Sequence, residues 1–183
     1  MLNNSLKEHL DCFHDLADQD GLIEAAAEQL TACIRRGGKI MICGNGGSAA
    51  DSQHFSTEIV GRFMRDRRAL PAIALTTDTS SLTAIGNDFG FSKVYSRQIE
   101  ALGRSEDCLI ALSTSGFSAN IIQAVTTAKN NHITTIGLTG ADGGKLSNMV
   151  DIAINVPARN TPRIQEVHIF ILHYWAECIE AIL

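Results

Sequence analysis

The sequence predicts an α/β protein in which five parallel strands are covered by helices. Short apolar runs recur along the chain, and helix-compatible segments separate most of them. These runs occupy residues 39–43, 71–75, 107–112, 133–138 and 151–156. Runs that are apolar on both faces suit strands buried in a parallel sheet, and the helices between them supply the crossovers that such a sheet needs.

The composition is typical of one globular domain in a reducing compartment. The chain has 183 residues, of which 45% are hydrophobic, so it can bury a full core. Its five cysteines are odd in number and include no CxxC pair, which argues against a disulfide framework and against a structural zinc site. The formal charge of −5 argues against a nucleic-acid partner. The N-terminus lacks the pattern of a signal peptide, so we expect a cytoplasmic protein that does not bind membranes.

Two helices are predicted before the first strand. Apolar residues recur at helical spacing from Leu2 to Leu16 and again from Leu22 to Ile34, and Gly37-Gly38 stops the second helix. We expect a single domain, residues 1–183, made of an N-terminal helical extension (1–36) and an α/β core with a C-terminal helix (37–183).

The segment 161–183 is predicted to form a helix that is buried on most of its sides. Thr161 is a suitable cap, and Pro162 suits the first helical position. Apolar residues then dominate, but charged residues such as Arg163 and Glu177 interrupt the run of about 20 nearly uncharged residues that a membrane span needs. Together with the amphipathic first helix, this helix predicts packing between subunits and therefore a homo-oligomer.

Three glycines follow the first predicted strand, in the stretch CGNGGSAAD at residues 43–51. Glycine lets the backbone approach a ligand closely, and the free N–H groups at the start of the next helix attract an anion. The alternatives are a tight turn without a ligand and a dinucleotide loop, since Gly44, Gly46 and Ala49 match that spacing. A dinucleotide loop also needs an acidic residue roughly 20 positions further on. The nearest candidate, Asp78, lies beyond that distance.

A second strand end carries the sequence STSGFS at residues 113–118, again before a helical pattern. Its four hydroxyl groups, together with helix N–H groups, can surround a phosphate monoester without a lysine or an arginine. The alternative is a hydroxyl-rich helix cap, which normally uses one or two such residues. Ligands of open parallel sheets lie beyond the carboxyl ends of the strands, so the two loops together favour a small phosphorylated ligand.

Two helices carry ionisable or polar residues that suit a catalytic or metal site. His54 and Glu58 stand at positions i and i+4 after the glycine loop, which suits a metal pair, an acid/base pair or an ordinary surface ion pair. On the last helix, Gln165 and His173 lie about 12 Å apart along the axis, and His168 points elsewhere. Core histidines that are satisfied by their neighbours are the alternative there.

Other polar residues permit two interpretations each. Asn87-Asp88, in IGNDFGF, is either a functional pair or an ordinary turn in the loop after the helix that follows the second strand, and the residue types favour the turn. Arg62 and Arg97 are either surface charges or residues that reach a phosphate across a subunit boundary, and the pattern alone does not decide.

Five motifs, in order along the chain, together resemble a known family. They are CGNGGSAADSQHFSTEIVGRF, IGNDFGF, LSTSGFSANI, LTGADGGKL and RIQEVHIFILH. They resemble the phosphoheptose isomerases, which are sedoheptulose 7-phosphate isomerases of the sugar isomerase (SIS) domain superfamily. The resemblance implies a three-layer, flavodoxin-like fold, a homotetramer, and the conversion of sedoheptulose 7-phosphate to D-glycero-D-manno-heptose 7-phosphate for lipopolysaccharide or other surface glycans.

The resemblance also implies functional residues from their places in these motifs. The implied substrate contacts are Asn45, Gly46, Gly47, Asn87, Asp88, Ser113, Thr114, Ser115, Ser118 and Gln165, with Ser48 as an additional phosphate donor. The implied ligands of one zinc ion per subunit are His54, Glu58, Gln165 and His173. The implied acid/base pair is Glu58 and His173. Phe117 departs from the family pattern, in which this position is often polar.

The resemblance leaves one competing function, a non-enzymatic SIS protein that binds the replication initiator. A relative of that kind keeps both loops but lacks the acidic residue and the last-helix histidine. Because Glu58 and His173 are both present, the sequence favours the enzyme. We expect Glu58 to move the carbon-bound proton between C1 and C2 of the sugar through an enediol, while His173 handles the oxygen-bound proton.

Overall fold

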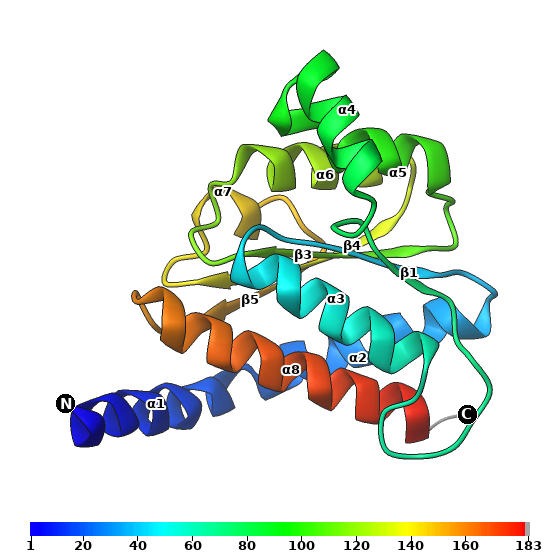
Figure 1. Ribbon diagram of the computed structural model, residues 1–183. Coiled ribbons are helices and arrows are strands. Elements are labelled where there is room, and N and C mark those ends of the chain that lie inside the picture. The colour runs from blue at the N-terminus through cyan, green and yellow to red at the C-terminus, as the bar shows by residue number, and fades with distance from the viewer. Residues whose placement is uncertain (182–183) are drawn as a thin grey trace.

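The computed structural model describes residues 1–181, and its centre is a parallel sheet in the order β2-β1-β3-β4-β5 (Figure 1). The strands are β1 (Ile40–Cys43), β2 (Ala72–Ala74), β3 (Cys108–Ser113), β4 (Thr134–Gly140) and β5 (Ile152–Val156). Each overlaps one of the predicted apolar runs, so the five strands are confirmed, although β3 and β4 continue past the ends of their runs. The order is that of a flavodoxin-like sheet, as the resemblance implied.

Helices cover both faces of the sheet and complete the predicted three layers (Figure 1). One face is covered by α2 (Asp20–Arg35), α3 (Gly47–Val60) and α8 (Thr161–Ala181), and the other by α5 (Ser96–Leu102), α6 (Ala119–Asn130) and α7 (Gly144–Ser147). Two further helices project from these layers: α1 (Leu2–Leu16) beyond the start of α8, and α4 (Thr79–Phe89) outside the layer of α5 and α6. Short 3-10 turns at Ala17–Gln19 and Phe91–Lys93 complete the helical elements of residues 1–181.

Each face of the sheet has its own hydrophobic core, because successive side chains of a strand point to opposite faces. In β1, Ile40 and Ile42 pack into the core shared with α2, α3 and α8. Met41 and Cys43 pack into the core shared with α5 and α6. All four side chains are fully buried. The strand is therefore apolar at every position, which explains the continuous apolar run in the sequence.

The C-terminal helix α8 is buried on most sides, as predicted, but its cap differs from the prediction. Asn160 caps the helix instead of Thr161, since its side-chain oxygen accepts a hydrogen bond from the Arg163 N–H at 3.2 Å. Further along, the buried Trp175 donates its indole N–H to the Ile23 carbonyl of α2 at 3.0 Å. These contacts fix α8 against its neighbours over its length.

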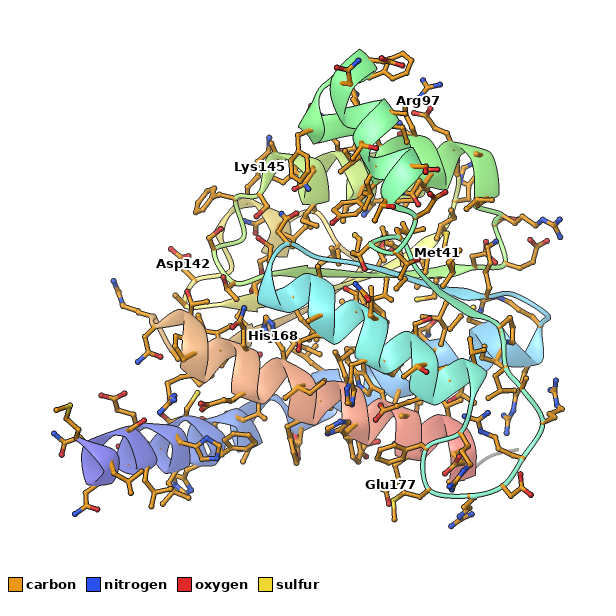
Figure 2. All side chains as sticks on the ribbon, in the orientation of Figure 1. Met41, Arg97, Asp142, Lys145, His168 and Glu177 are labelled. Atoms are coloured by element: carbon orange, nitrogen blue, oxygen red, sulfur yellow. The ribbon has the colours of Figure 1, made fainter. Side chains whose placement is uncertain are left out.

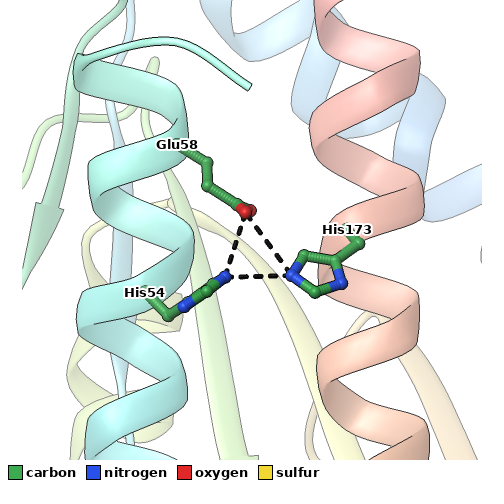
Figure 3. Close-up of side chains that lie close together, drawn as sticks. All are labelled: His54, Glu58 and His173. Carbon is green, nitrogen blue, oxygen red and sulfur yellow. Dashed lines mark hydrogen bonds and ion pairs between the residues drawn. The ribbon is translucent and has the colours of Figure 1, made fainter. Parts of the chain in front are cut away.

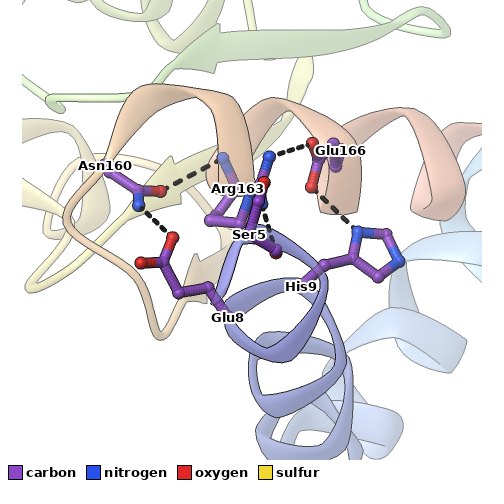
Figure 4. A network of polar contacts seen from close by, with 6 residues as sticks. All are labelled: Ser5, Glu8, His9, Asn160, Arg163 and Glu166. Carbon is purple, nitrogen blue, oxygen red and sulfur yellow. Dashed lines mark hydrogen bonds and ion pairs between the residues drawn. The ribbon is translucent and has the colours of Figure 1, made fainter. Parts of the chain in front are cut away.

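A polar network holds α1 against the start of α8 (Figure 4). Arg163 donates to the Ser5 carbonyl at 2.6 Å and to Glu166 at 2.5 Å, and Glu166 also lies 2.9 Å from His9 Nδ1. The N-terminal extension is thus attached to the helix that ends the core. Within residues 1–181, no helix has the length and apolar character that crossing a membrane requires.

Candidate active site

Two loops meet at the carboxyl edge of the sheet, one after β1 and one after β3. The two strands pair in parallel, with Cys43 opposite Ala111, so the loops that follow them emerge side by side. The chain continues from β1 into α3 on one face and from β3 into α6 on the other. Such a reversal of strand order opens a crevice suited to a ligand. The structure thereby brings together two sets of predicted substrate contacts: Asn45, Gly46, Gly47 and Ser48, and Ser113, Thr114, Ser115 and Ser118.

The glycine loop has a backbone that depends on its glycines. Gly46 precedes α3 with φ +56°, a conformation that strains any residue with a Cβ. At Gly44, an added Cβ would lie 2.6 Å from the Ser48 carbonyl oxygen. Tyr95 anchors the loop by donating its hydroxyl to the Gly44 carbonyl at 2.6 Å. The loop places the N-terminus of α3, a favourable position for an anion, at the crevice.

The serine loop, residues 113–118, does not use its hydroxyl groups to cap α6. Within the described chain, the Ser118 side chain makes no capping hydrogen bond, and its hydroxyl accepts from the Ser113 hydroxyl at 3.0 Å. Gly116, with φ +69°, packs so closely on the next loop that an added Cβ would lie 2.0 Å from the Gly143 carbonyl oxygen. These contacts favour the ligand-binding interpretation over the hydroxyl-rich cap.

Three side chains from α3 and α8 converge on one point (Figure 3). His54 Nε2 lies 3.0 Å from Glu58 Oε1 and 2.9 Å from His173 Nε2, and His173 Nε2 lies 3.4 Å from Glu58 Oε1. The Glu58 side chain is largely buried, whereas both imidazoles are partly exposed. The second carboxylate oxygen, Oε2, is buried and has no hydrogen-bond partner within residues 1–181.

A cation at the centre of this triangle explains its geometry better than hydrogen bonds do. A neutral imidazole offers one N–H and one lone pair, so two Nε2 atoms and one carboxylate oxygen cannot satisfy three mutual contacts. In a tetrahedral zinc site with bonds of about 2.0–2.1 Å, the ligand atoms lie roughly 3.3–3.4 Å apart. The edges of the triangle, 2.9–3.4 Å, approach that spacing. His54, Glu58 and His173 therefore fit a divalent metal ion.

Gln165, the fourth predicted ligand, lies beside the glycine loop. An added Cβ on Gly47 would lie 2.4 Å from the Gln165 amide nitrogen, so this side chain covers the first residue of α3. His173 follows Gln165 after about 12 Å of helix. The structure thus places Gln165 against the start of α3, about two helical turns of α8 from His173, and its role as a metal ligand stays a prediction.

Asn87 and Asp88 lie on α4, on the opposite side of the sheet from α3 and α8 (Figure 1). The prediction of a turn was wrong, because both residues belong to the last turn of α4, which ends at Gly90 with φ +85°. Both are exposed, and Asn87 donates to Asp88 at 2.8 Å. Nearby, the Arg97 guanidinium carbon lies 4.0 Å from the centroid of the Phe89 ring. Within one chain, the sheet separates Asn87 and Asp88 from the triangle.

Sequence reasoning missed three residues at this site. Asp51 lies one turn before His54, with a buried Oδ2 that lacks a partner in residues 1–181. Burial raises the pKa of Asp51 above its ordinary value, and the His54 and His173 imidazoles offset this only in part. Phe63 stacks on His173, with ring centroids 5.7 Å apart. Asn120 hydrogen-bonds Asn45 of the glycine loop. The i, i+3 spacing to His54 points to Asp51, but the other two contacts join segments that no local pattern relates.

The fold and the site define the chain as a SIS domain protein, and the SIS domain family model matches residues 6–140. The phosphoheptose isomerase of Roseiflexus sp. (strain RS-1) is 54% identical over 165 residues, which are 90% of this chain and 84% of that relative. The solved phosphoheptose isomerase of Neisseria gonorrhoeae has a TM-score of 0.93 at 46% identity and covers 98% of this chain and 97% of its own. That of Francisella tularensis has a TM-score of 0.94 at 38% identity, with 97% and 95% covered. The chain therefore belongs to the phosphoheptose isomerase family.

Proposed function

We propose that this chain converts sedoheptulose 7-phosphate to D-glycero-D-manno-heptose 7-phosphate, a precursor of heptose in lipopolysaccharide or other surface glycans. Its family membership supports this reaction, because the relative from Roseiflexus, at 54% identity, is a phosphoheptose isomerase. The observation that carries the proposal is the meeting of Glu58 and His173 from the separate helices α3 and α8.

The two loops are the proposed phosphate site. Hydroxyl groups of the serine loop and backbone N–H groups at the starts of α3 and α6 provide donors around a phosphate. Ser48, buried in the first turn of α3, is proposed as an additional donor. Gln165, beside Gly47, is suited to contact the sugar between the phosphate and its reacting carbons. Phosphate bound away from the chemistry supplies binding energy and orientation.

Glu58 and His173 are the proposed acid/base pair. Oε1 of Glu58 faces both imidazoles, and the Glu58 carboxylate is proposed to take the carbon-bound proton between C1 and C2. His173, on the other helix, then exchanges the proton of the carbonyl and hydroxyl oxygens. Movement of both protons passes through an enediol and interconverts the ketose and the aldose.

The metal proposed for the triangle is zinc, held by His54, Glu58 and His173, with Gln165 as a further ligand from the family pattern. Two imidazoles and one carboxylate are a common donor set of catalytic zinc sites. When bound, the ion would polarise the carbonyl oxygen of the sugar and stabilise negative charge on it.

A homotetramer is the proposed assembly, with α1 and α4 at its interfaces. Within residues 1–181 of one chain, α4 buries no side chain. The outer side of α1 carries exposed leucines: Leu2, Leu6 and Leu10. Asn87 and Asp88 are proposed to reach the substrate in a neighbouring subunit, and Arg62, exposed after α3, is a candidate for the same role. Light scattering tests this assembly, and an active monomer would contradict it.

The cytoplasm is the proposed location of the enzyme. All five cysteines are free thiols, which suits a reducing compartment. The test of function is incubation of the purified, zinc-supplied chain with sedoheptulose 7-phosphate, followed by detection of the aldose by NMR. Absence of conversion would contradict the proposal. The initiator-binding alternative predicts that result, together with capture of the initiator in a pull-down, but the names of the relatives favour the isomerase.

A further inference from the structure

A buried ion pair joins the two helices that carry the triangle. Arg67 lies in the loop after α3, and Glu180 lies in the last turn of α8. Arg67 Nε is 3.2 Å from Glu180 Oε1, and the two side chains are only 8% and 3% exposed. Figure 1 shows the loop after α3 passing around the C-terminal end of α8. Ions this deeply buried lose their hydration and need further hydrogen bonds to compensate.

Arg67 finds those hydrogen bonds at the C-terminus of α3. Its guanidinium donates to the backbone carbonyls of Glu58 at 2.6 Å, Ile59 at 3.0 Å and Gly61 at 3.3 Å. The last carbonyls of a helix lack partners inside the helix and carry partial negative charge, so a cation stabilises them. One of these carbonyls belongs to Glu58, so Arg67 fixes the backbone from which the proposed base projects.

Glu180 holds the same loop from the side of α8. Its carboxylate accepts the backbone N–H groups of Phe63 at 3.1 Å and of Met64 and Arg65 at 2.8 Å each. Burial raises the pKa of Glu180, but these three donors and Arg67 outweigh it and bring the pKa below its ordinary value. The carboxylate is therefore charged at neutral pH and binds the loop as an anion.

The loop in turn contacts the triangle. The Phe63 ring, whose backbone Glu180 holds, stacks on the His173 imidazole at a centroid distance of 5.7 Å and an interplanar angle of 22°. Glu180 itself follows His173 by two helical turns, on the same side of α8. The Arg67–Glu180 ion pair thus contacts α3 at Glu58 and belongs to α8 two turns after His173, so it lies close to proposed metal ligands on both helices.

We propose that Arg67 and Glu180 form a clamp that positions the catalytic triangle without touching the substrate. The clamp sets the spacing of α3 and α8 and holds Phe63 against His173, so that donor atoms on two helices stay within reach of one ion. The effect on catalysis rests on the proposed function. The effect on metal binding does not, because it can be measured without turnover. Residues that support metal ligands in this way normally affect affinity and rate strongly.

Glu180→Gln tests the clamp, because the amide keeps the size of the side chain and loses the charge that Arg67 needs. The matched control is Asp107→Asn, just before β3 at the amino edge of the sheet, which is the edge opposite the crevice. Asp107 is 2% exposed, accepts the backbone N–H groups of Lys39 and Arg104 at 2.9 and 2.8 Å, and pairs with Lys39 Nζ at 2.5 Å. Both substitutions therefore remove one buried charge from a carboxylate that binds backbone and cation.

Three measurements separate positioning from general stability: the melting temperature, the affinity for Co²⁺ from an absorption titration, and kcat and KM for sedoheptulose 7-phosphate. Glu180→Gln is expected to weaken Co²⁺ binding and to lower kcat, each by about 10–100-fold. KM should change much less, because the proposed phosphate loops lie at the other end of α3. Asp107→Asn should lower the melting temperature while both Co²⁺ affinity and kcat stay near the values of the unmodified chain.

Unchanged Co²⁺ affinity and kcat in folded Glu180→Gln would overturn the clamp, and so would equal losses in Asp107→Asn. Failure of the unmodified chain to bind Co²⁺ would also overturn it. If Glu180→Gln does not fold, Arg67→Lys replaces it: the ammonium keeps the charge but has three donors on one atom instead of the planar guanidinium fork, so it cannot bind the carbonyls of α3 and the Glu180 carboxylate in the same geometry, and the same selective loss is expected. Co²⁺ binding without turnover in the unmodified chain would contradict the proposed function. The clamp would then be tested by the Co²⁺ affinities of the variants alone.

Discussion

Asn45 and Asn120 bind each other through two hydrogen bonds, one in each direction, at 2.9 and 2.8 Å. Asn45 belongs to the glycine loop, and the buried Asn120 lies in the first turn of α6, just after the serine loop. The pair joins two loops that lie 75 residues apart in the sequence. The two loops proposed to bind phosphate are therefore joined, and a change to either amide is expected to disturb both.

Asn120→Ala is expected to raise KM for sedoheptulose 7-phosphate by about tenfold, with a smaller change in kcat. The substitution leaves the Asn45 amide without its partner, at a cost of about 1–3 kcal/mol, so the loops no longer hold the phosphate in a fixed geometry. Steady-state kinetics measure both constants. Thr126→Ala is the control, because Thr126 is exposed on the same helix and donates to the Ile122 carbonyl. An unchanged KM in Asn120→Ala would mean that the loops bind phosphate independently.

Glu58→Gln is expected to lower kcat by a factor of about 10² to 10⁴ while the fold and sugar-phosphate binding persist. The amide has the shape of the carboxylate but cannot accept the proton that moves between C1 and C2. Calorimetry with the sugar phosphate measures binding, and the NMR assay measures turnover. Turnover close to that of the unmodified chain would remove Glu58 from the role of base.

Removal of metal by a chelator is expected to abolish turnover and to lower the melting temperature, and Zn²⁺ should restore both. A ligand at 100 times its Kd stabilises the folded state by about 2.7 kcal/mol. His54→Ala should lose the stabilisation by Zn²⁺, because it removes one corner of the triangle. The control is His132→Asn: His132 has φ +57°, which asparagine tolerates, and lies outside the triangle. A Zn²⁺ shift that persists in His54→Ala would place the metal elsewhere.

Local patterns predicted the parts of this fold and site that depend on neighbours in the sequence. The strands were predictable because both faces are buried, which makes Ile40–Cys43 apolar at every position. His54 and Glu58 were predictable as a pair because helical spacing alone brings them together. The same reasoning failed at Asn87 and Asp88, since their turn-forming residue types lie in a helix that continues until Gly90.

Local sequence patterns could not predict contacts between distant segments of the chain. Arg67 and Glu180 each resemble ordinary surface charges in the sequence, and only the path of the loop around α8 makes them a buried pair. Asn120 likewise shows no pattern of its own, because its partner Asn45 lies on the glycine loop, 75 residues away in the sequence. Residues of this kind become recognisable once the topology fixes which strand ends and helix ends are neighbours.

The burial of His168 is expected to make the folded state sensitive to moderate acid. Its side chain is buried on the side of α8 that faces the sheet (Figure 2), and Nε2 lies 3.0 Å from the Thr139 carbonyl oxygen. A carbonyl only accepts hydrogen bonds, so Nε2 carries the proton of a neutral ring. Burial lowers the pKa of His168 to about 4, and the bond to Thr139 offsets this only in part.

Because the pKa of His168 is lower in the folded chain than the ordinary value of about 6.5, the unfolded chain binds the extra proton first. This contribution to stability is complete above about pH 6.5 and is lost as the pH falls towards 4, by about 3 kcal/mol in total. Urea unfolding at several pH values between 7 and 4 measures it. His168→Gln, which keeps an N–H donor for Thr139, should flatten the dependence over this range, whereas the exposed His132→Asn should not. The same slope in His168→Gln as in the unmodified chain would assign the acid sensitivity to other groups.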